Sequence, residues 1–477
     1  MHLTAAALVP TPGYGEFAAE YAAFAAALRG ETLPSPVAEA VRVNLLDTLA
    51  CATAGRTAPG VADVAALVTE WGGASQALVW GSHTRVPAHH AAWINGMMAH
   101  ARDYDDTHDA AVLHAGVSVV PAALAAAELN PRATGADLLA GVAAGLELVC
   151  RLGLATTIGI IDSGFIYSSL FGYFGAAVAA ARVAGLDTAG IQNAMGIAYS
   201  QAAGTHQVTR DAALMKRMQP GLAAKAGVTA VQLAQRGISG AQNVFDGIDG
   251  LFRIYLRNSY DPARLRADLG QRWEFTNLSY KPYPCCRLNH TAIDAALAIA
   301  NQPGFDPGAI TRVIAGVSHQ SYQAVCTPSE IRKHPTTVVQ AQFSIPFTVA
   351  AALIDREIGL RHFTAEGLHR PDILTLAARV ECGVDDAIER DFSRGVSPTA
   401  LVVQAGNVSF QQRTDVPSGH PQVPMTAQAR RAKLLDCLRV GGPVWPDDTA
   451  DRLTRLVAAA GELPEARSLA LAMGARS

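Results

Sequence analysis

Apolar side chains follow helical spacing from about residue 16 to residue 258, in segments bounded mostly by Gly, Pro or Asn. Ser35 and Pro36 supply an N-cap and a first-turn proline for a helix over 37–54, which Gly55 ends. The run 172–181 has so little polar surface that we expect it inside a helical bundle. Further helices are predicted over 88–101, 117–129, 135–152, 169–185, 188–203 and 221–236.

The pattern changes near Pro262. Beyond it, short β-branched runs predict strands over 310–317, 378–382 and 400–410, with helices interleaved over 290–301 and 340–355. Helical spacing returns from Thr426 to the end of the chain. The predicted fold class is therefore mostly α, with a smaller α+β lid domain (266–425) inserted into a large all-helical domain built from both termini (1–265 and 426–477). A site in the cleft between them would be typical.

Composition supports this organisation. A chain of 477 residues exceeds the usual size of a single core, and 50% hydrophobic but only 6% aromatic residues favour closely packed helices. The net charge of −3 provides no basic field, so we expect no nucleic acid partner. We also expect no membrane span, because no uncharged apolar run reaches about 18 residues.

The cysteines and the first ten residues indicate the compartment. Seven cysteines are an odd, scattered set with no CxxC pair, which favours reduced thiols over disulfides or a zinc site. The N-terminal ten residues lack a cationic leader followed by a cleavage motif. A cytoplasmic location is expected.

Two polar stretches interrupt this apolar chain and are the candidate chemistry. Burying unpaired charge is costly, so such groups need partners, and we expect the two stretches to meet in one anion-handling site. The first, 100–114, contains His100, Asp103, Thr107 and His114, and the second, 281–290, contains Lys281, Cys286 and Arg287.

A third polar segment, 215–221, places Lys216 just before Pro220-Gly221. The proline and glycine predict a break, with an Ala-rich helix starting after them. An anion at that helix N-terminus would meet free N–H groups, with Lys216 at hand.

Other interpretations of the polar residues stay open. A calcium loop is disfavoured, because His108 and His114 stand where such a loop has glycine and glutamate. His108-Asp109 is also compatible with a metal-dependent hydrolase that recruits His89, His90 or His100. Asp105, Asp106 and Asp109 would equally suit a solvated loop capping a helix, and the vicinal Cys285-Cys286 pair would suit simple packing.

With these segments in view, the chain resembles the MmgE/PrpD family, which includes 2-methylcitrate dehydratase, cis-aconitate decarboxylase and iminodisuccinate epimerase. The matching motifs lie at 95–100, 103–107, 281–287 and 335–346 and span nearly the whole chain. The resemblance implies a homodimer with an all-helical domain and an α+β lid. It places catalytic roles on Asp103, Thr107, His114, Lys216 and Lys281.

The chain departs from the family pattern near residue 166. Relatives acting on aconitate-like substrates commonly carry His-Pro at the positions of Ile166-Tyr167, and Gln219 replaces a histidine found in several relatives. Because the phenol of Tyr167 stands next to the position of the missing histidine, Tyr167 is a further candidate catalytic residue. The candidate substrate-binding residues are His100, Gln219, Cys286 and Arg287.

The family's reactions share one step, the formation of a carbanion beside a carboxylate. Fixed cations would stabilise that charge, His114 would titrate near neutral pH, and Asp103 would orient it. A lysine among other cations could have its pKa lowered enough to act as a base. With no nucleotide or redox motif, no cofactor and no metal are expected.

The leading hypothesis is a lyase that removes water or carbon dioxide from a small di- or tricarboxylate. The alternative is an epimerase using Tyr167 and a lysine as opposed acid and base. A metal-dependent hydrolase and a non-catalytic helical scaffold are the remaining hypotheses.

Overall fold

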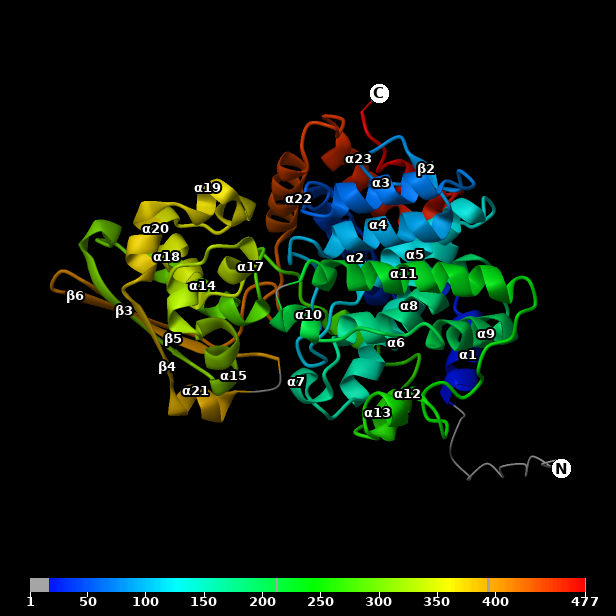
Figure 1. The fold of residues 1–477 in the computed structure, drawn as a ribbon, viewed down its shortest axis with the longest axis horizontal. Coiled ribbons are helices and arrows are strands. Elements are labelled where there is room, and N and C mark those ends of the chain that lie inside the picture. The colour runs from blue at the N-terminus through cyan, green and yellow to red at the C-terminus, as the bar shows by residue number, and fades with distance from the viewer. Residues whose placement is uncertain (1–16, 212, 393–394, 477) are drawn as a thin grey trace.

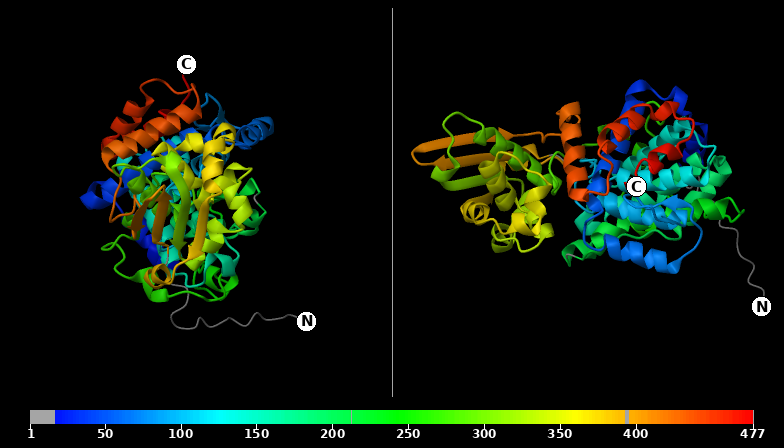
Figure 2. Two further views of the ribbon diagram at one scale, coloured as in Figure 1. Left: turned by 90° about the vertical axis from the view of Figure 1, so that its left-hand side faces the viewer. Right: turned by 90° about the horizontal axis from the view of Figure 1, so that it is seen from above.

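The computed structural model describes residues 17–211, 213–392 and 395–476. A larger helical body and a smaller body containing a β-sheet lie side by side (Figure 1), and the view from above shows the same division (Figure 2, right). The mostly helical class predicted from the sequence is confirmed. The prediction about the first ten residues lies outside the described residues.

The helical body is built from both ends of the chain. Its N-terminal helices are α1 (Phe17–Ala27), α2 (Ser35–Gly55), α3 (Val61–Trp71), α4 (Ala88–His100), α5 (Gly116–Leu129), α6 (Gly135–Ala155), α7 (Ile160–Ser163), α8 (Tyr167–Val183), α9 (Thr188–Tyr199), α10 (Gln207–Arg210), α11 (Met215–Ala234), α12 (Leu251–Ile254) and α13 (Pro262–Arg266). The chain returns in α22 (Ala427–Gly441), α23 (Thr449–Ala458) and α24 (Arg467–Leu471). A small hairpin, β1 (Ala77–Leu78) and β2 (Arg85–Val86), lies between α3 and α4.

Helix α8 occupies the interior of this body, as its small residues predict. Every residue from Tyr167 to Val183 is buried, and Gly175 lies so close to α6 that an added Cβ would be 2.8 Å from the carbonyl oxygen of Gly145. Small residues thus allow the two backbones to approach closely. Helix α6 has the length and hydropathy of a membrane span, but 94% of its most apolar window is buried inside the protein.

The predicted break at Pro220-Gly221 is wrong, because α11 begins at Met215 and runs through both residues. Tertiary packing overrides the local signal. Gly221 packs on α4, where an added Cβ would lie 2.3 Å from the carbonyl oxygen of Trp93. Lys216 therefore lies in the first turn of a long helix and not ahead of one.

The smaller body is a four-stranded sheet with helices on one face. The strand order is β4-β3-β5-β6, with β3 parallel to β4 and antiparallel to β5. Helices α14 and α18 pack against the sheet and against each other (Figure 1). The strands are β3 (Ile310–Val317), β4 (Val380–Val384), β5 (Thr399–Ala405) and β6 (Val408–Thr414); the helices are α14 (His290–Ala300), α15 (His319–Ser321), α16 (Ser329–Lys333), α17 (Val338–Gln342), α18 (Ile345–Asp355), α19 (Ala365–Leu368), α20 (Pro371–Ala377) and α21 (Asp386–Asp391).

Two predicted elements are each divided in two. The single strand expected over 400–410 is a hairpin, because Gly406, with φ +57°, turns the chain between β5 and β6. The single helix expected over 340–355 is α17 followed by α18. Ser344 caps α18 by accepting a hydrogen bond from the backbone N–H of Phe347, which starts a new helix there.

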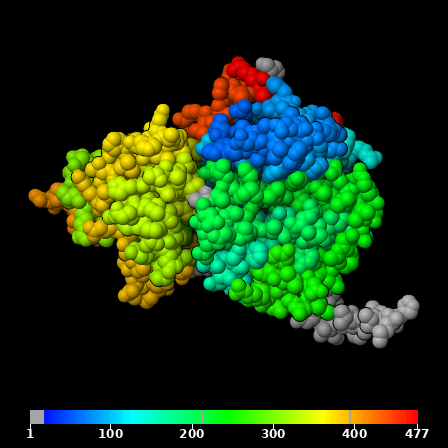
Figure 3. Space-filling view, in the orientation of Figure 1, coloured from blue at the N-terminus to red at the C-terminus, as the bar shows by residue number. Residues whose placement is uncertain are grey.

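The two bodies have separate hydrophobic cores. One core draws on residues 17–278 and 434–473 together with Leu360, and the other draws on residues 285–410. The division into a helical domain (1–265 and 426–477) and an α+β lid domain (266–425) stays a prediction. The space-filling view shows the two bodies in contact along one side of the helical body (Figure 3).

Candidate active site

A cavity of about 190 Å³ lies where the helical body meets the α+β body. It is lined by residues from both, and the structure brings the two polar stretches and the start of α11 together in its walls. The predicted residues among its lining are His100, Asp103, Thr107, His114, Lys216, Lys281, Cys286 and Arg287.

Backbone contacts hold the two stretches together. Thr107 and Ser279 exchange N–H···O hydrogen bonds of 2.8 and 2.7 Å, as in a short antiparallel bridge. Lys281 Nζ donates to the carbonyl oxygen of Asp103 at 2.9 Å. Asp103 itself has φ +54°, a left-handed conformation that Asp tolerates better than most residues. The loop after α4 is thus held in place by hydrogen bonds to Ser279 and Lys281.

Asp103 lies between two lysines. Its carboxylate is 3.2 Å from Lys216 Nζ and 3.4 Å from Lys281 Nζ. Burial alone would raise the pKa of Asp103, but Lys216 and Lys281 hold it well below its ordinary value. Taken by themselves, these three groups carry one positive charge, which can attract an anion into the cavity.

The expectation of a lysine with a lowered pKa is wrong for Lys281. Its side chain is only 1% exposed, and burial by itself would lower its pKa. The carboxylates of Asp103 and Asp105 outweigh burial and raise the pKa above the ordinary lysine value. Lys281 is therefore a permanent cation and not a base.

His114 is held by Asp105 and by the backbone. Its Nδ1 lies 2.5 Å from the carbonyl oxygen of Asp106 and 3.1 Å from Asp105 Oδ2. A carbonyl oxygen only accepts, so Nδ1 carries a proton and Nε2 is the atom left to accept one. The prediction that Asp103 orients this imidazole is wrong, because the carboxylate beside His114 Nδ1 is that of Asp105.

Asp105 also holds the second imidazole, with Oδ2 2.9 Å from His100 Nδ1. Burial alone would raise the pKa of Asp105, but His114 and His100 hold it well below its ordinary value. Burial lowers the pKa of His100 despite the neighbouring carboxylate. His100 is accordingly a neutral partner that shares the carboxylate with His114.

Arg287 lines the cavity, but its charge is already paired. Its Nε and Nη2 donate to the two carboxylate oxygens of Asp109 at 3.0 and 3.2 Å, and its Nη1 donates to the carbonyl oxygen of Ser418 at 2.9 Å. Ser279 Oγ donates to the same carboxylate at 2.5 Å. Arg287 would have to leave this network to clamp a substrate carboxylate with two hydrogen bonds.

Two predicted residues do not lie in the cavity wall. Tyr167 is fully buried, its ring stacks on Phe171, and its hydroxyl donates to the carbonyl oxygen of Ile158 at 2.5 Å. Gln219 is bonded to Ser169 and to the backbone of Thr205. The structure thus brings Ile166 to the wall and turns its neighbour Tyr167 into the core.

Several residues at the site are not among those that the sequence predicts for it. Asp105 stands in the polar run, where the sequence suits a solvated loop equally well. Ser168 lines the cavity and accepts a hydrogen bond from the backbone N–H of His114 at 2.8 Å. His206 and Phe343 also line the wall, and neither stood in a polar cluster that could have marked it.

Among the described residues, His100, Asp105 and His114 are the strongest candidates for binding a metal ion. They offer three ligand atoms within 4.8 Å of one another. His89 and His90 do not join them, since eleven and ten residues along α4 separate them from His100 by about 15 Å or more. The proton required on His114 Nδ1 makes a hydrogen-bonded triad the simpler description of this cluster.

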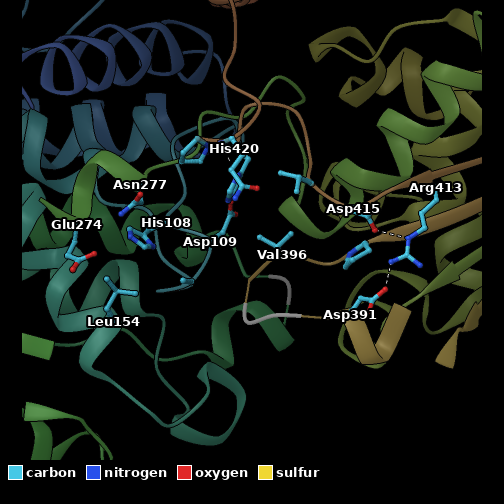
Figure 4. A pocket seen from close by; sticks show the side chains of 15 residues that line it. His108, Asp109, Leu154, Glu274, Asn277, Asp391, Val396, Arg413, Asp415 and His420 are labelled. Atoms are coloured by element: carbon cyan, nitrogen blue, oxygen red, sulfur yellow. Dashed lines mark hydrogen bonds and ion pairs between the residues drawn. The ribbon is translucent and has the colours of Figure 1, made fainter. Parts of the chain in front are cut away.

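A larger cavity of about 860 Å³ adjoins the first one. Figure 4 shows His108 and Asp109 on the helical side facing Arg413, Asp391 and Asp415 on the α+β side. Arg413 forms ion pairs with both Asp391 and Asp415. Asp109 lines both cavities, so its pair with Arg287 forms part of the partition between them.

Cys286 provides a direct check on the electrostatics of the small cavity. Burial and the nearby carboxylate of Asp103 raise its pKa to about 11. The reactive thiolate is then about one part in a thousand at pH 8, so alkylation by iodoacetamide should be about 100-fold slower than for glutathione. The rate, followed by mass spectrometry, should rise about tenfold per pH unit to pH 10. A rate that levels off near pH 9 would contradict this environment.

Comparison with known proteins places the whole arrangement in a family. A model of the MmgE/PrpD N-terminal domain matches residues 19–263, and a model of the MmgE/PrpD C-terminal domain matches residues 283–459. Cis-aconitate decarboxylase of Aspergillus terreus is 26% identical over 390 residues, which cover 77% of this chain and 78% of that protein.

Two further relatives give the same picture. Human cis-aconitate decarboxylase is 27% identical over 398 residues, covering 80% of this chain and 78% of the relative. A cis-aconitate decarboxylase-like protein of Aspergillus oryzae is 27% identical over 388 residues, covering 77% and 80%.

Proposed function

The chain belongs to the MmgE/PrpD family, and we propose that it is a lyase that removes carbon dioxide or water from a small di- or tricarboxylate. The observation that carries the proposal is the convergence of Lys216, Lys281 and His114 on one cavity of about 190 Å³. Its similarity to cis-aconitate decarboxylases supports the decarboxylating form of the reaction.

The lysines would hold the substrate carboxylate. After Asp103 has neutralised one of them, the other charge is available to a substrate carboxylate and to the negative charge that develops beside it. Such fixed cations in a buried site stabilise a carbanion without reorganising during the reaction. Because Lys281 is buried and its pKa is raised, it would stay charged throughout.

His114 would move the proton. In dehydration, Nε2 takes the proton from the carbon beside the carboxylate, the C–H electrons form the double bond, and the imidazolium passes that proton to the hydroxyl, which leaves as water. In decarboxylation, His114 begins as the imidazolium, carbon dioxide leaves with the electrons of the broken C–C bond staying on carbon, and that carbon takes the proton from the imidazolium. The carboxylate of Asp105 would stabilise that imidazolium. Neither route requires a cofactor, and cofactor independence is part of the proposal.

Incubation with candidate acids in heavy water tests the reaction type. A decarboxylase gives a product with one carboxylate fewer and one deuterium at the carbon that lost it, whereas a dehydratase gives an unsaturated acid that absorbs in the far ultraviolet. An epimerase would put deuterium into the substrate without forming either product. This outcome, or hydrolysis dependent on a stoichiometric bound metal, would contradict the proposal.

Lys216→Gln is expected to lower kcat/KM about 100-fold, because it removes one fixed donor to the developing charge. The matched control is Lys225→Gln on the same helix, whose ammonium lies over the rings of Trp71 and Trp93 and outside the cavity lining. The control should keep nearly full activity. Equal losses in both variants would show that the charge acts through the fold and not through the substrate.

We further propose that the protein is a cytoplasmic homodimer. Its seven cysteines are free thiols, which supports a reducing compartment. Light scattering of the purified protein tests the dimer.

A further inference from the structure

Part of the lining of the active cavity is apolar. Six of its lining side chains, called the apolar wall below, carry no polar atom. They come from the loop before α5, from α7, from the start of α8 and from the α+β body. They are Val112, Leu113, Ile160, Ile166, Leu288 and Phe343.

This wall lies next to the proton-transfer group and to a lysine. Val112 and Leu113 directly precede His114 in the chain, and His114 is bonded to Ser168, two residues beyond Ile166. Phe343 lies under Lys216, whose Nζ is 5.5 Å from the ring centroid. A ligand whose carboxylate meets the lysines and whose reacting carbon meets His114 therefore has its remaining substituent beside apolar side chains.

The charges of the site offer little to a third carboxylate. Among the described residues at the cavity, three cations, Lys216, Lys281 and Arg287, stand against Asp103 and Asp109 in the lining. Asp105 lies immediately behind the two imidazoles. With the histidines counted as uncharged these charges cancel, so each additional carboxylate on the substrate is less well compensated than the one before it.

We infer that the substrate carries an alkyl group on this apolar wall, in place of a third carboxylate, and belongs to the class of alkyl-substituted dicarboxylates. The inference rests on the proposed function and narrows it. A carboxylate against the six apolar side chains would lose hydration without gaining a partner. Each methylene buried there instead would raise affinity about fourfold.

A matched pair of unreactive ligands tests the inference. Tricarballylate is succinate bearing a carboxymethyl group, and 2-isobutylsuccinate has an isopropyl group in place of that third carboxylate, with nearly the same shape. Titration calorimetry of the full-length protein with succinate and with each of these two ligands gives three dissociation constants. We expect 2-isobutylsuccinate to bind at least about tenfold more tightly than tricarballylate, and more tightly than succinate.

Ile166→Ser should reduce the preference for 2-isobutylsuccinate to about threefold or less, because it removes apolar surface from the wall. Ile166 is the N-cap of α8, where serine is well tolerated, so the fold should survive. Ile161→Ser is the control, since Ile161 is 61% exposed and outside the cavity lining, and it should leave all three dissociation constants unchanged.

The possible outcomes distinguish a failure of the alkyl-group inference from a failure of the proposed lyase function. Equal or tighter binding of tricarballylate, with succinate bound, would overturn the alkyl-group inference and leave the proposed lyase intact. An unchanged preference in Ile166→Ser would likewise overturn it. If none of the three acids binds, the proposed function itself fails.

Discussion

Replacing His114 by asparagine is expected to lower kcat/KM by about 100- to 10,000-fold, which is the range that a single general acid–base group contributes. The asparagine Nδ2 can keep the hydrogen bond that His114 Nδ1 donates to the Asp106 carbonyl oxygen, now 2.5 Å, so the loop should persist. What disappears is the basic Nε2. Steady-state kinetics on the substrate found by the heavy-water screen measures the loss, and thermal unfolding checks that the fold is kept.

Asp105→Asn isolates the contribution of the carboxylate behind this imidazole. The Asp106 carbonyl oxygen still fixes the tautomer, so we expect a smaller loss, about tenfold to 100-fold. The double variant His114→Asn/Asp105→Asn should be no slower than His114→Asn alone. Fully additive losses would show that Asp105 acts independently of His114.

Lys433→Met is expected to lower the free energy of unfolding by about 3–5 kcal/mol, because it leaves the buried Asp47 carboxylate without its partner. Lys433 Nζ lies 2.6 Å from Asp47 Oδ1 and donates to the carbonyl oxygen of Tyr104 at 2.7 Å, and its side chain is 2% exposed. Activity should fall as well, since Tyr104 stands between Asp103 and Asp105 in the active-site loop. Urea unfolding measures the stability change, provided that the dependence of the unfolding free energy on urea concentration is the same in both proteins.

Two variants control for this prediction. Arg431 on the same helix pairs with Asp451 at 2.7 Å, but both side chains are about half exposed, so Arg431→Met should cost less than about 1 kcal/mol. Asp47→Leu combined with Lys433→Met removes both buried charges and should recover much of the lost stability. If Arg431→Met and Lys433→Met cost the same, burial of the Lys433 pair is not what stabilises the protein.

Much of the secondary structure could be predicted because local signals and tertiary packing agree. The predicted helix over 37–54 corresponds to α2, and the strand over 310–317 is β3 with the same bounds. At Pro220-Gly221 the two disagreed. The local signal predicts a break, but α11 continues through both residues and Gly221 packs closely on α4.

Composition and spacing by themselves determined that this chain folds as packed helices with an α+β insertion, and that its ionisable side chains gather in two stretches that must find partners. Tertiary structure alone decided which partners they found. The fold places His114 beside Asp105 and pairs Arg287 with Asp109. It also places carboxylates near Lys281, which raise its pKa. The reason is physical: the strength of a charge pair depends on separation and burial, and neither is set by distance along the chain.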